Sequence, residues 1–195
     1  VGERAPVIPS ADPFDGSLGS ARGRKLETLE GLDVRPTTEI VKEAVFSIIH
    51  FRLPGAKIAD IFAGSGQMGI EALSRGASRA VFVDQSRASL QVVRKNLQTT
   101  GLAANAQVVM DGAESFLQRT GETFDFIFLD PPYNKGYGEK LLPLLGRALS
   151  EEGLVLFEHA KEEPLPDEAG GLKKVKDYRY GKTFVTTYTH TESRA

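Results

Sequence analysis

The sequence of 195 residues contains no cysteine, and this absence limits the chemistry open to the protein. Without cysteine the chain forms no disulfide, offers no thiolate nucleophile and cannot ligate a metal through sulfur. The histidines, His50, His159 and His190, are scattered, so we expect no metal site. The chain also lacks an apolar run that could span a bilayer and a signal-peptide pattern at its start. These absences favour a cytoplasmic protein.

Neither sign of charge dominates, because 24 basic and 26 acidic residues give a net charge of −2. Nucleic-acid-binding domains are usually basic, so contacts to phosphate would have to come from local clusters. Acids concentrate in 151–168 and bases in 173–182, and a further basic cluster holds Arg22, Arg24 and Lys25. For any one cluster, a solvated surface explains the charges about as well as a binding role.

The length and a hydrophobic fraction of 41% suit one globular domain, which we place at residues 19–190. Residues 1–18 hold three prolines and no periodicity, so we expect a mobile leader there, of native or of cloning origin. The first part of the domain, 19–52, is expected to cover the substrate and cofactor, and 191–195 form a tail. We expect a monomer.

Hydrophobic periodicity predicts strands and helices that alternate along the chain. The first helix is expected at 35–51, with Thr37 or Thr38 as its cap. The expected strands are 57–62, 79–84, 106–111, 124–130, 153–159, 172–180 and 183–190. This alternation predicts an α/β fold with a Rossmann-like, doubly wound, mostly parallel sheet and a C-terminal antiparallel hairpin.

Aspartates stand at the ends of three predicted strands, at Asp84, Asp111 and Asp130. The carboxyl ends of parallel strands open onto the ligand crevice of such a sheet. One aspartate there often only caps the next helix, but three in one sheet favour a binding role.

A glycine-rich loop, 64–69, follows the first strand and matches the pattern G-x-G-x-x-G, and Asp84 comes twenty residues after Gly64. This spacing suits an acid that binds a ribose hydroxyl, in a dehydrogenase as well as in other enzymes. Asp60 separates the two cases. A carboxylate within about 4 Å of a pyrophosphate is repelled by ~1 to 4 kcal/mol, whereas S-adenosylmethionine carries a sulfonium and an ammonium and no phosphate.

The strongest signal is Asp130-Pro131-Pro132-Tyr133, directly after the strand 124–130. Two prolines remove two backbone donors and stiffen the turn, so carbonyls and a carboxylate remain as acceptors beside an aromatic ring. A planar group with N–H donors fits such a site. The exocyclic amine of a base would bond Asp130 and the Pro131 carbonyl while Tyr133 stacks on the ring. A surface turn after a buried strand is the plainer alternative.

The combined motifs resemble Rossmann-like methyltransferases that modify base amines, and more narrowly the RsmD family. The first resemblance lies in D-I-F-A-G-S-G (60–66), V-D (83–84), D-G-A (111–113) and D-P-P-Y (130–133). The second lies in G-S-A-R-G-R-K-L (19–26), R-P-T-T (35–38), G-I-E-A-L-S-R-G-A (69–77) and Y-G-K-T (180–183). It implies methyl transfer from S-adenosylmethionine to N2 of a guanine in bacterial 16S ribosomal RNA, free or within the small subunit.

The resemblance also implies the site residues. Asp84 would hold the cofactor ribose and Asp111 its adenine amine. The expected cofactor-binding residues are Asp60, Ala63, Gly64, Ser65, Gly66, Asp84, Gln85, Asp111 and Gly112. The expected catalytic residues are Asp130, Pro131, Pro132 and Tyr133. The expected RNA-binding residues are Arg22, Arg24, Lys174 and Lys182.

Three classes of function stay open at this point. Besides the RNA enzyme, a methyltransferase acting on DNA adenine N6 or on a protein glutamine amide shares the logic of the Asp-Pro-Pro-aromatic motif. A non-catalytic cofactor-binding module is the third class, and the intact 130–133 motif disfavours it. The chemistry of the motif does not separate guanine N2 from adenine N6, because both are aromatic amines.

Calorimetry with S-adenosylmethionine and NAD tests the cofactor prediction. We expect binding of S-adenosylmethionine and none of NAD, and Asp84→Ala should weaken that binding by ~1 to 3 kcal/mol because it leaves hydrogen-bond donors unpaired. Binding of NAD without S-adenosylmethionine would contradict the prediction.

Overall fold

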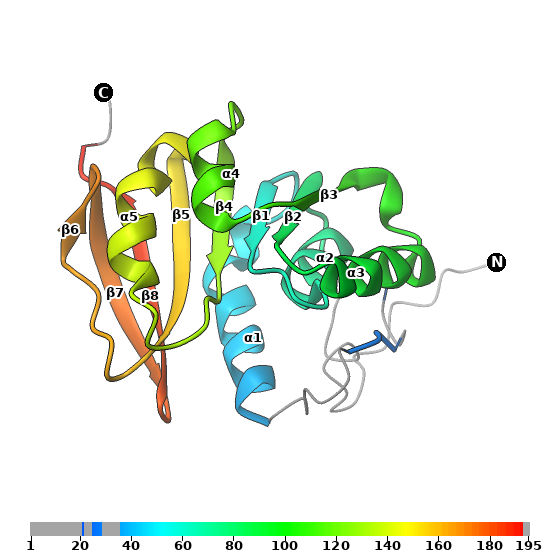
Figure 1. Cartoon of the computed structure of the whole chain (residues 1–195), viewed down its shortest axis with the longest axis horizontal. Helices are drawn as coiled ribbons and strands as arrows, with labels where there is room; N and C mark the ends of the chain where they lie inside the picture. Colours follow the sequence, from blue (N-terminus) through cyan, green and yellow to red (C-terminus); the bar gives the residue numbers. More distant parts are fainter. Residues whose placement is uncertain (1–20, 22–24, 29–35, 193–195) are drawn as a thin grey trace.

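A single eight-stranded sheet organises the computed structural model, which describes residue 21, residues 25–28 and residues 36–192 (Figure 1). The strand order is β3-β2-β1-β4-β5-β8-β7-β6. The strands are β1 (Lys57–Ile61), β2 (Arg79–Asp84), β3 (Ala106–Met110), β4 (Phe124–Leu129), β5 (Leu149–Ala160), β6 (Glu168–Ala169), β7 (Leu172–Tyr180) and β8 (Thr183–His190). The first five pair in parallel, and β8, β7 and β6 are antiparallel. This confirms the predicted fold class.

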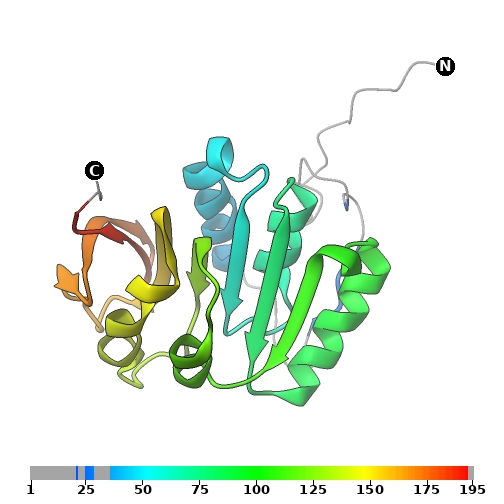
Figure 2. The same cartoon turned by 90° about the horizontal axis from the view of Figure 1, so that it is seen from above.

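Helices cover both faces of the sheet, as the alternating pattern predicts. Figure 2 shows α1 and α5 on opposite sides of the strands. The helices are α1 (Pro36–Ile49), α2 (Gln67–Ser74), α3 (Arg87–Thr100), α4 (Ala113–Arg119) and α5 (Tyr137–Ala148), with short 3-10 turns η1 (His50–Arg52) and η2 (Ala103–Asn105). One buried apolar cluster lies under α1, α2 and α3, and a second lies under α4 and α5. None of the helices within 36–192 is both long and apolar enough to traverse a bilayer.

The predicted boundaries agree with the structure to within two residues, except at the start of β5. The helix α1 begins at Pro36, so Thr37 and Thr38 lie in its first turn and the predicted cap is wrong; proline suits that first position because its missing N–H has no partner there. The strand β5 begins at Leu149, four residues early, because Leu149 pairs with Phe124 before a bulge in the β4–β5 ladder.

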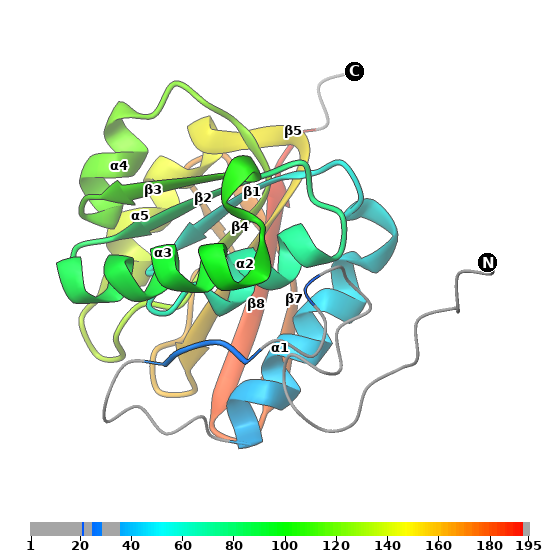
Figure 3. The ribbon, with the colours of Figure 1, turned by 90° about the vertical axis from the view of Figure 1, so that its right-hand side faces the viewer.

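The C-terminal strands form the predicted hairpin. Gly181 takes a left-handed φ of 62° in the turn, and Tyr180 pairs with Thr183. Because Thr183 also pairs with Ala160, the turn lies at the carboxyl end of β5. Figure 3 shows the hairpin beside α1. The fold therefore brings the hairpin turn to the same edge of the sheet as the predicted site.

Candidate active site

The strand order gathers the predicted acids along one edge of the sheet. The ends of β3, β2, β1 and β4 are neighbours, and they carry or precede Asp111, Asp84 and Asp130. The Asp111 N–H donates to the Asp84 carbonyl at 3.1 Å, so two of these ends are joined directly. The separate strand-end aspartates therefore belong to one edge.

The glycine loop is held open by its own backbone and by Asp84. Gly64 and Gly66 have φ angles of 57° and 82°, which favour glycine, and nothing lies within 4 Å of where a Gly64 side chain would stand. The Gly64 N–H donates to Asp84 Oδ2 at 2.9 Å, and the Ser86 N–H donates to Oδ1 at 2.8 Å. The space beside Gly64 is therefore left for a ligand.

Asp60 lies inside β1 and is only 3% exposed. Its Oδ2 accepts the N–H of Gly69 at 2.9 Å, in the first turns of α2. Burial raises the pKa of Asp60 to about 7, against the lowering effect of this hydrogen bond. A carboxylate thus occupies the helix terminus that would receive a pyrophosphate in a dinucleotide-binding fold.

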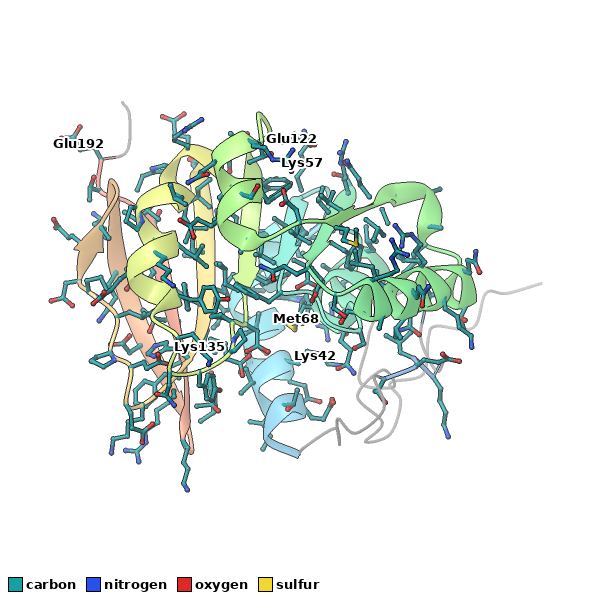
Figure 4. The ribbon with its side chains drawn as sticks, viewed as in Figure 1. Lys42, Lys57, Met68, Glu122, Lys135 and Glu192 are labelled. Carbon is teal, nitrogen blue, oxygen red and sulfur yellow. The ribbon has the colours of Figure 1, made fainter. Side chains whose placement is uncertain are left out.

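A cavity of about 470 Å³ opens between α1, the glycine loop and the ends of β4 and β5. Lys42 from α1 and Met68 from α2 line it (Figure 4). Its lining includes Asp60 with Ala63, Gly64 and Ser65, and also Asp130, Tyr133 and Glu158. One space therefore joins the predicted cofactor loop to the predicted catalytic motif.

The 130–133 motif forms the rim of this cavity. Asp130 is open to the cavity, and the surrounding walls desolvate its carboxyl enough to raise its pKa to about 6. Pro131 is buried and Pro132 is exposed. The Tyr133 ring is 39% exposed, and its hydroxyl lies 3.3 Å from Thr183 Oγ1 on the hairpin. An acceptor and a partly open ring therefore stand side by side.

Backbone strain occurs in both loops that line the cavity. Phe62 and Asn134 are non-glycine residues with φ angles of 64° and 58°. Phe62 directly precedes the glycine loop, and Asn134 directly follows the 130–133 motif. Strained residues of this kind concentrate at functional sites, because the surrounding structure must hold them against their preferred conformation.

The predicted site residues did not include Glu158, which lines this cavity, or Asn96, which supports its glycine loop. Glu158, near the end of β5, lines the cavity beside Asp130, and burial together with the Asp130 charge raises its pKa to about 8. Asn96 on α3 is 1% exposed; its amide donates to the carbonyls of Ser65 and Glu27, and its oxygen accepts the Glu27 N–H. No sequence signal singled out Glu158, because it lies inside the predicted strand 153–159 and not after it.

The remaining predicted cofactor residues lie outside the lining of the cavity: Gly66 precedes α2 in the glycine loop, and Asp84, Gln85, Asp111 and Gly112 lie at or just after the ends of β2 and β3. Asp111 accepts the N–H of Gly112 at 2.9 Å and pairs with Arg119. Burial is the largest single effect and raises the pKa of Asp111, but the hydrogen bonds from Arg119, Ser115 and Gly112 and the Arg119 charge together hold that pKa below the usual range.

Of the predicted RNA-binding residues the structure describes Lys174 and Lys182, which lie at opposite ends of β7. Lys182 is exposed in the hairpin turn, close to the 130–133 motif. Lys174 lies farther down β7, and its ammonium contacts the Leu165 carbonyl at 2.9 Å, Asp167 at 3.2 Å and Asp177 at 3.4 Å. These contacts give Lys174 a structural role. The predictions for Arg22 and Arg24 fall outside the described residues, as does the leader 1–18. Among the residues described, no group of three or more histidine and acidic side chains is arranged to hold a metal.

Several known proteins similar to this chain are named as methyltransferases. The family described as conserved hypothetical protein 95 matches residues 18–189. The ribosomal RNA small subunit methyltransferase D of Escherichia coli is 40% identical over 150 residues, which cover 76% of this chain and 75% of that protein. The protein YlbH of Bacillus subtilis is 41% identical over 175 residues, 87% of this chain and 95% of its own. The solved structure of yhhF from Escherichia coli is 37% identical with a TM-score of 0.79, covering 88% of this chain and 94% of that one.

Replacement of Asp60 by asparagine tests the electrostatics of the site. The pKa of Asp60 is about 7 in the folded protein against the usual 3.8, so the folded state favours the neutral carboxyl. The free energy of unfolding therefore falls as pH rises from about 4 towards 7 and the carboxyl ionises. Asp60→Asn should therefore raise the free energy of unfolding by about 1 to 3 kcal/mol at pH 8, with a gain that grows between about pH 4 and pH 7. Denaturant titrations at several pH values measure it, with exposed Glu151→Gln as the control. A gain that does not vary with pH would contradict the assignment.

Proposed function

The chain belongs to the RsmD family, and from that premise we propose that it methylates N2 of a guanine in small-subunit ribosomal RNA, with S-adenosylmethionine as the methyl donor. The observation that carries this proposal is the cavity that joins the glycine loop to Asp130 and Tyr133. We further propose that the protein acts as a cytoplasmic monomer on 16S RNA, free or within the small subunit.

The acidic residues of the site fit S-adenosylmethionine. Asp60 and Asp130 bring carboxyl groups to the cavity, Asp84 lies nearby at the end of β2, and a sulfonium and an ammonium are attracted to negative charge. The glycine loop admits close approach of the cofactor, Asp84 would hold its ribose and Asp111 its adenine amine. When bound, this cofactor supplies an activated methyl group.

Residues of this chain position the amine that receives the methyl group. Asp130 and the Pro131 carbonyl accept its hydrogens, which favours rehybridisation of the nitrogen and stabilises the positive charge that develops on it. Tyr133 stacks on the base and holds it in a near-attack geometry. With a pKa of about 6, the Asp130 carboxylate is ionised at neutral pH and is suited to take the proton that the product amine releases.

Contacts to the RNA backbone are proposed for Lys182 in the hairpin turn and for Arg22 and Arg24. The target base would lie in a folded loop of the RNA, where it turns out of its stack without disrupting a long duplex. Because the net charge is −2, shape should contribute more to recognition than general attraction to phosphate.

Replacement of Asp130 separates catalysis from cofactor binding. Asp130→Ala should lower turnover by at least ~100-fold and leave cofactor affinity within a few-fold, because this carboxylate faces the amine. Tyr133→Phe should be nearly silent if the ring acts by stacking, and Tyr133→Ala should not. Single-turnover rates and calorimetry measure the two effects. Equal rates for Asp130→Ala and the parent would make Asp130 only a turn residue.

A panel of substrates tests the proposed function. Naked small-subunit RNA, assembled small subunits, duplex DNA and short single strands are each incubated with labelled S-adenosylmethionine, and the methylated nucleoside is identified by mass spectrometry. We expect N2-methylguanosine in ribosomal RNA. Preferential methylation of adenine in DNA would replace this proposal with the DNA enzyme.

A further inference from the structure

Glu158 is a carboxyl in the cavity for which the proposed reaction has no role. It comes one step after the last β4–β5 pair, Leu129 with Phe157, and Asp130 is its counterpart on β4. Because side chains alternate along a strand, Asp130 and Glu158 point to the same face, and both line the cavity. Adjacent strands lie about 4.8 Å apart, so one flat base edge reaches both carboxyls.

Apolar side chains flank Glu158 on its own strand and on β8. Its antiparallel partner on β8 is Val185, and Leu156 precedes it on the same face, so its walls are apolar. Within the described part of the chain, no residue donates a hydrogen bond to the Glu158 carboxyl or to that of Asp130. Two acceptors therefore face the cavity side by side, and a ligand that fills the cavity must supply hydrogen-bond donors to them.

The two purine amines differ in the atom beside them. In guanine the N2 amine stands next to the ring N1–H, so the edge presents two neighbouring donors. In adenine the N6 amine stands next to an unprotonated N1, which is an acceptor. A pair of acceptors complements the guanine edge and leaves the adenine edge mismatched.

We propose that Glu158 accepts the ring N1–H of the target base while Asp130 accepts its amine, and that this pairing selects guanine over adenine. The inference rests on the proposed function and assigns its choice of base to one residue. Glu158 is a specificity-determining residue at the end of β5, and the methyl transfer itself is left to the 130–133 motif.

The selection holds in either protonation state of Glu158. As a carboxylate, it accepts the N1–H of guanine and repels the lone pair of adenine N1. As a neutral carboxyl, its carbonyl oxygen accepts N1–H and its hydroxyl donates to O6, which gives guanine two hydrogen bonds; adenine N1 would take only one. The other titratable groups that line the cavity are Asp60, Lys42, Asp130 and Tyr133, and Asp130 is the one whose charge acts on Glu158.

The test compares guanine with 2-aminopurine at the methylated position of small-subunit RNA. The 2-aminopurine base keeps the amine but lacks N1–H and O6. We expect the parent to prefer guanine over 2-aminopurine by roughly tenfold or more in kcat/KM. Glu158→Leu should lose most of that preference, because its kcat/KM should fall for the guanine substrate and not for the 2-aminopurine substrate. Glu158→Gln, which keeps an acceptor and a donor, should retain the preference. Exposed Glu151→Gln is the matched control, and calorimetry should show unchanged cofactor affinity in all variants.

The outcomes separate the two proposals. If the parent methylates guanine and Glu158→Leu keeps the preference for guanine, or loses activity on both substrates equally, the role of Glu158 is overturned while the proposed function stands. If the parent methylates adenine, both are overturned. If no RNA is methylated, the proposed function fails, and a binding experiment decides the role of Glu158. The protein mixed with S-adenosylhomocysteine is titrated with guanosine and with 2-aminopurine riboside and followed by NMR. Equal binding of the two nucleosides, or a preference for guanosine that is unchanged in Glu158→Leu, overturns that role.

Discussion

The parallel pairing of β1 with β4 is the constraint on which the site depends. The ladder from Ile58–Phe126 to Ile61–Leu129 joins the half of the sheet that carries the glycine loop to the half that carries the 130–133 motif. A shift of β4 by one residue against β1 would place Asp130 on the face of the sheet opposite to Asp60. Because both strands are buried, the apolar side chains of β4 fix the register, and the distance between cofactor loop and catalytic motif is set by core packing.

The same edge of the sheet explains why the site is costly to fold. Asp60, Asp130 and Glu158 all have raised pKa values, and burial is the main cause for each. Lys42 is also buried, and desolvation lowers its pKa against the charges of Glu71 and Glu39. Such groups weaken the isolated fold and gain from a ligand that supplies complementary charge or donors, so stability is concentrated elsewhere, in the two apolar clusters on the faces of the sheet.

Local signals were enough to predict the strands and the hairpin, since short apolar runs and the Tyr180–Thr183 turn report on their own neighbourhood. Features that depend on distant partners were not predicted: β5 begins early because it pairs with Phe124, and the two-residue β6 exists only against β7. The site divides in the same way. The glycine loop and the 130–133 motif were recognisable in the sequence, whereas Glu158 among other acids and Asn96 within α3 acquire meaning only from what the fold places beside them.

The amide of Asn96 joins two parts of the chain that are 38 residues apart, the Glu27 backbone and the Ser65 carbonyl of the glycine loop. Thr28, next to that backbone, lines the cavity. A shared side chain makes the loop and the segment 25–28 energetically interdependent, and thermodynamic linkage makes this dependence reciprocal. Whatever orders the loop also lowers the entropy cost of ordering the segment, so Asn96 couples the binding of a ligand at the one to binding at the other.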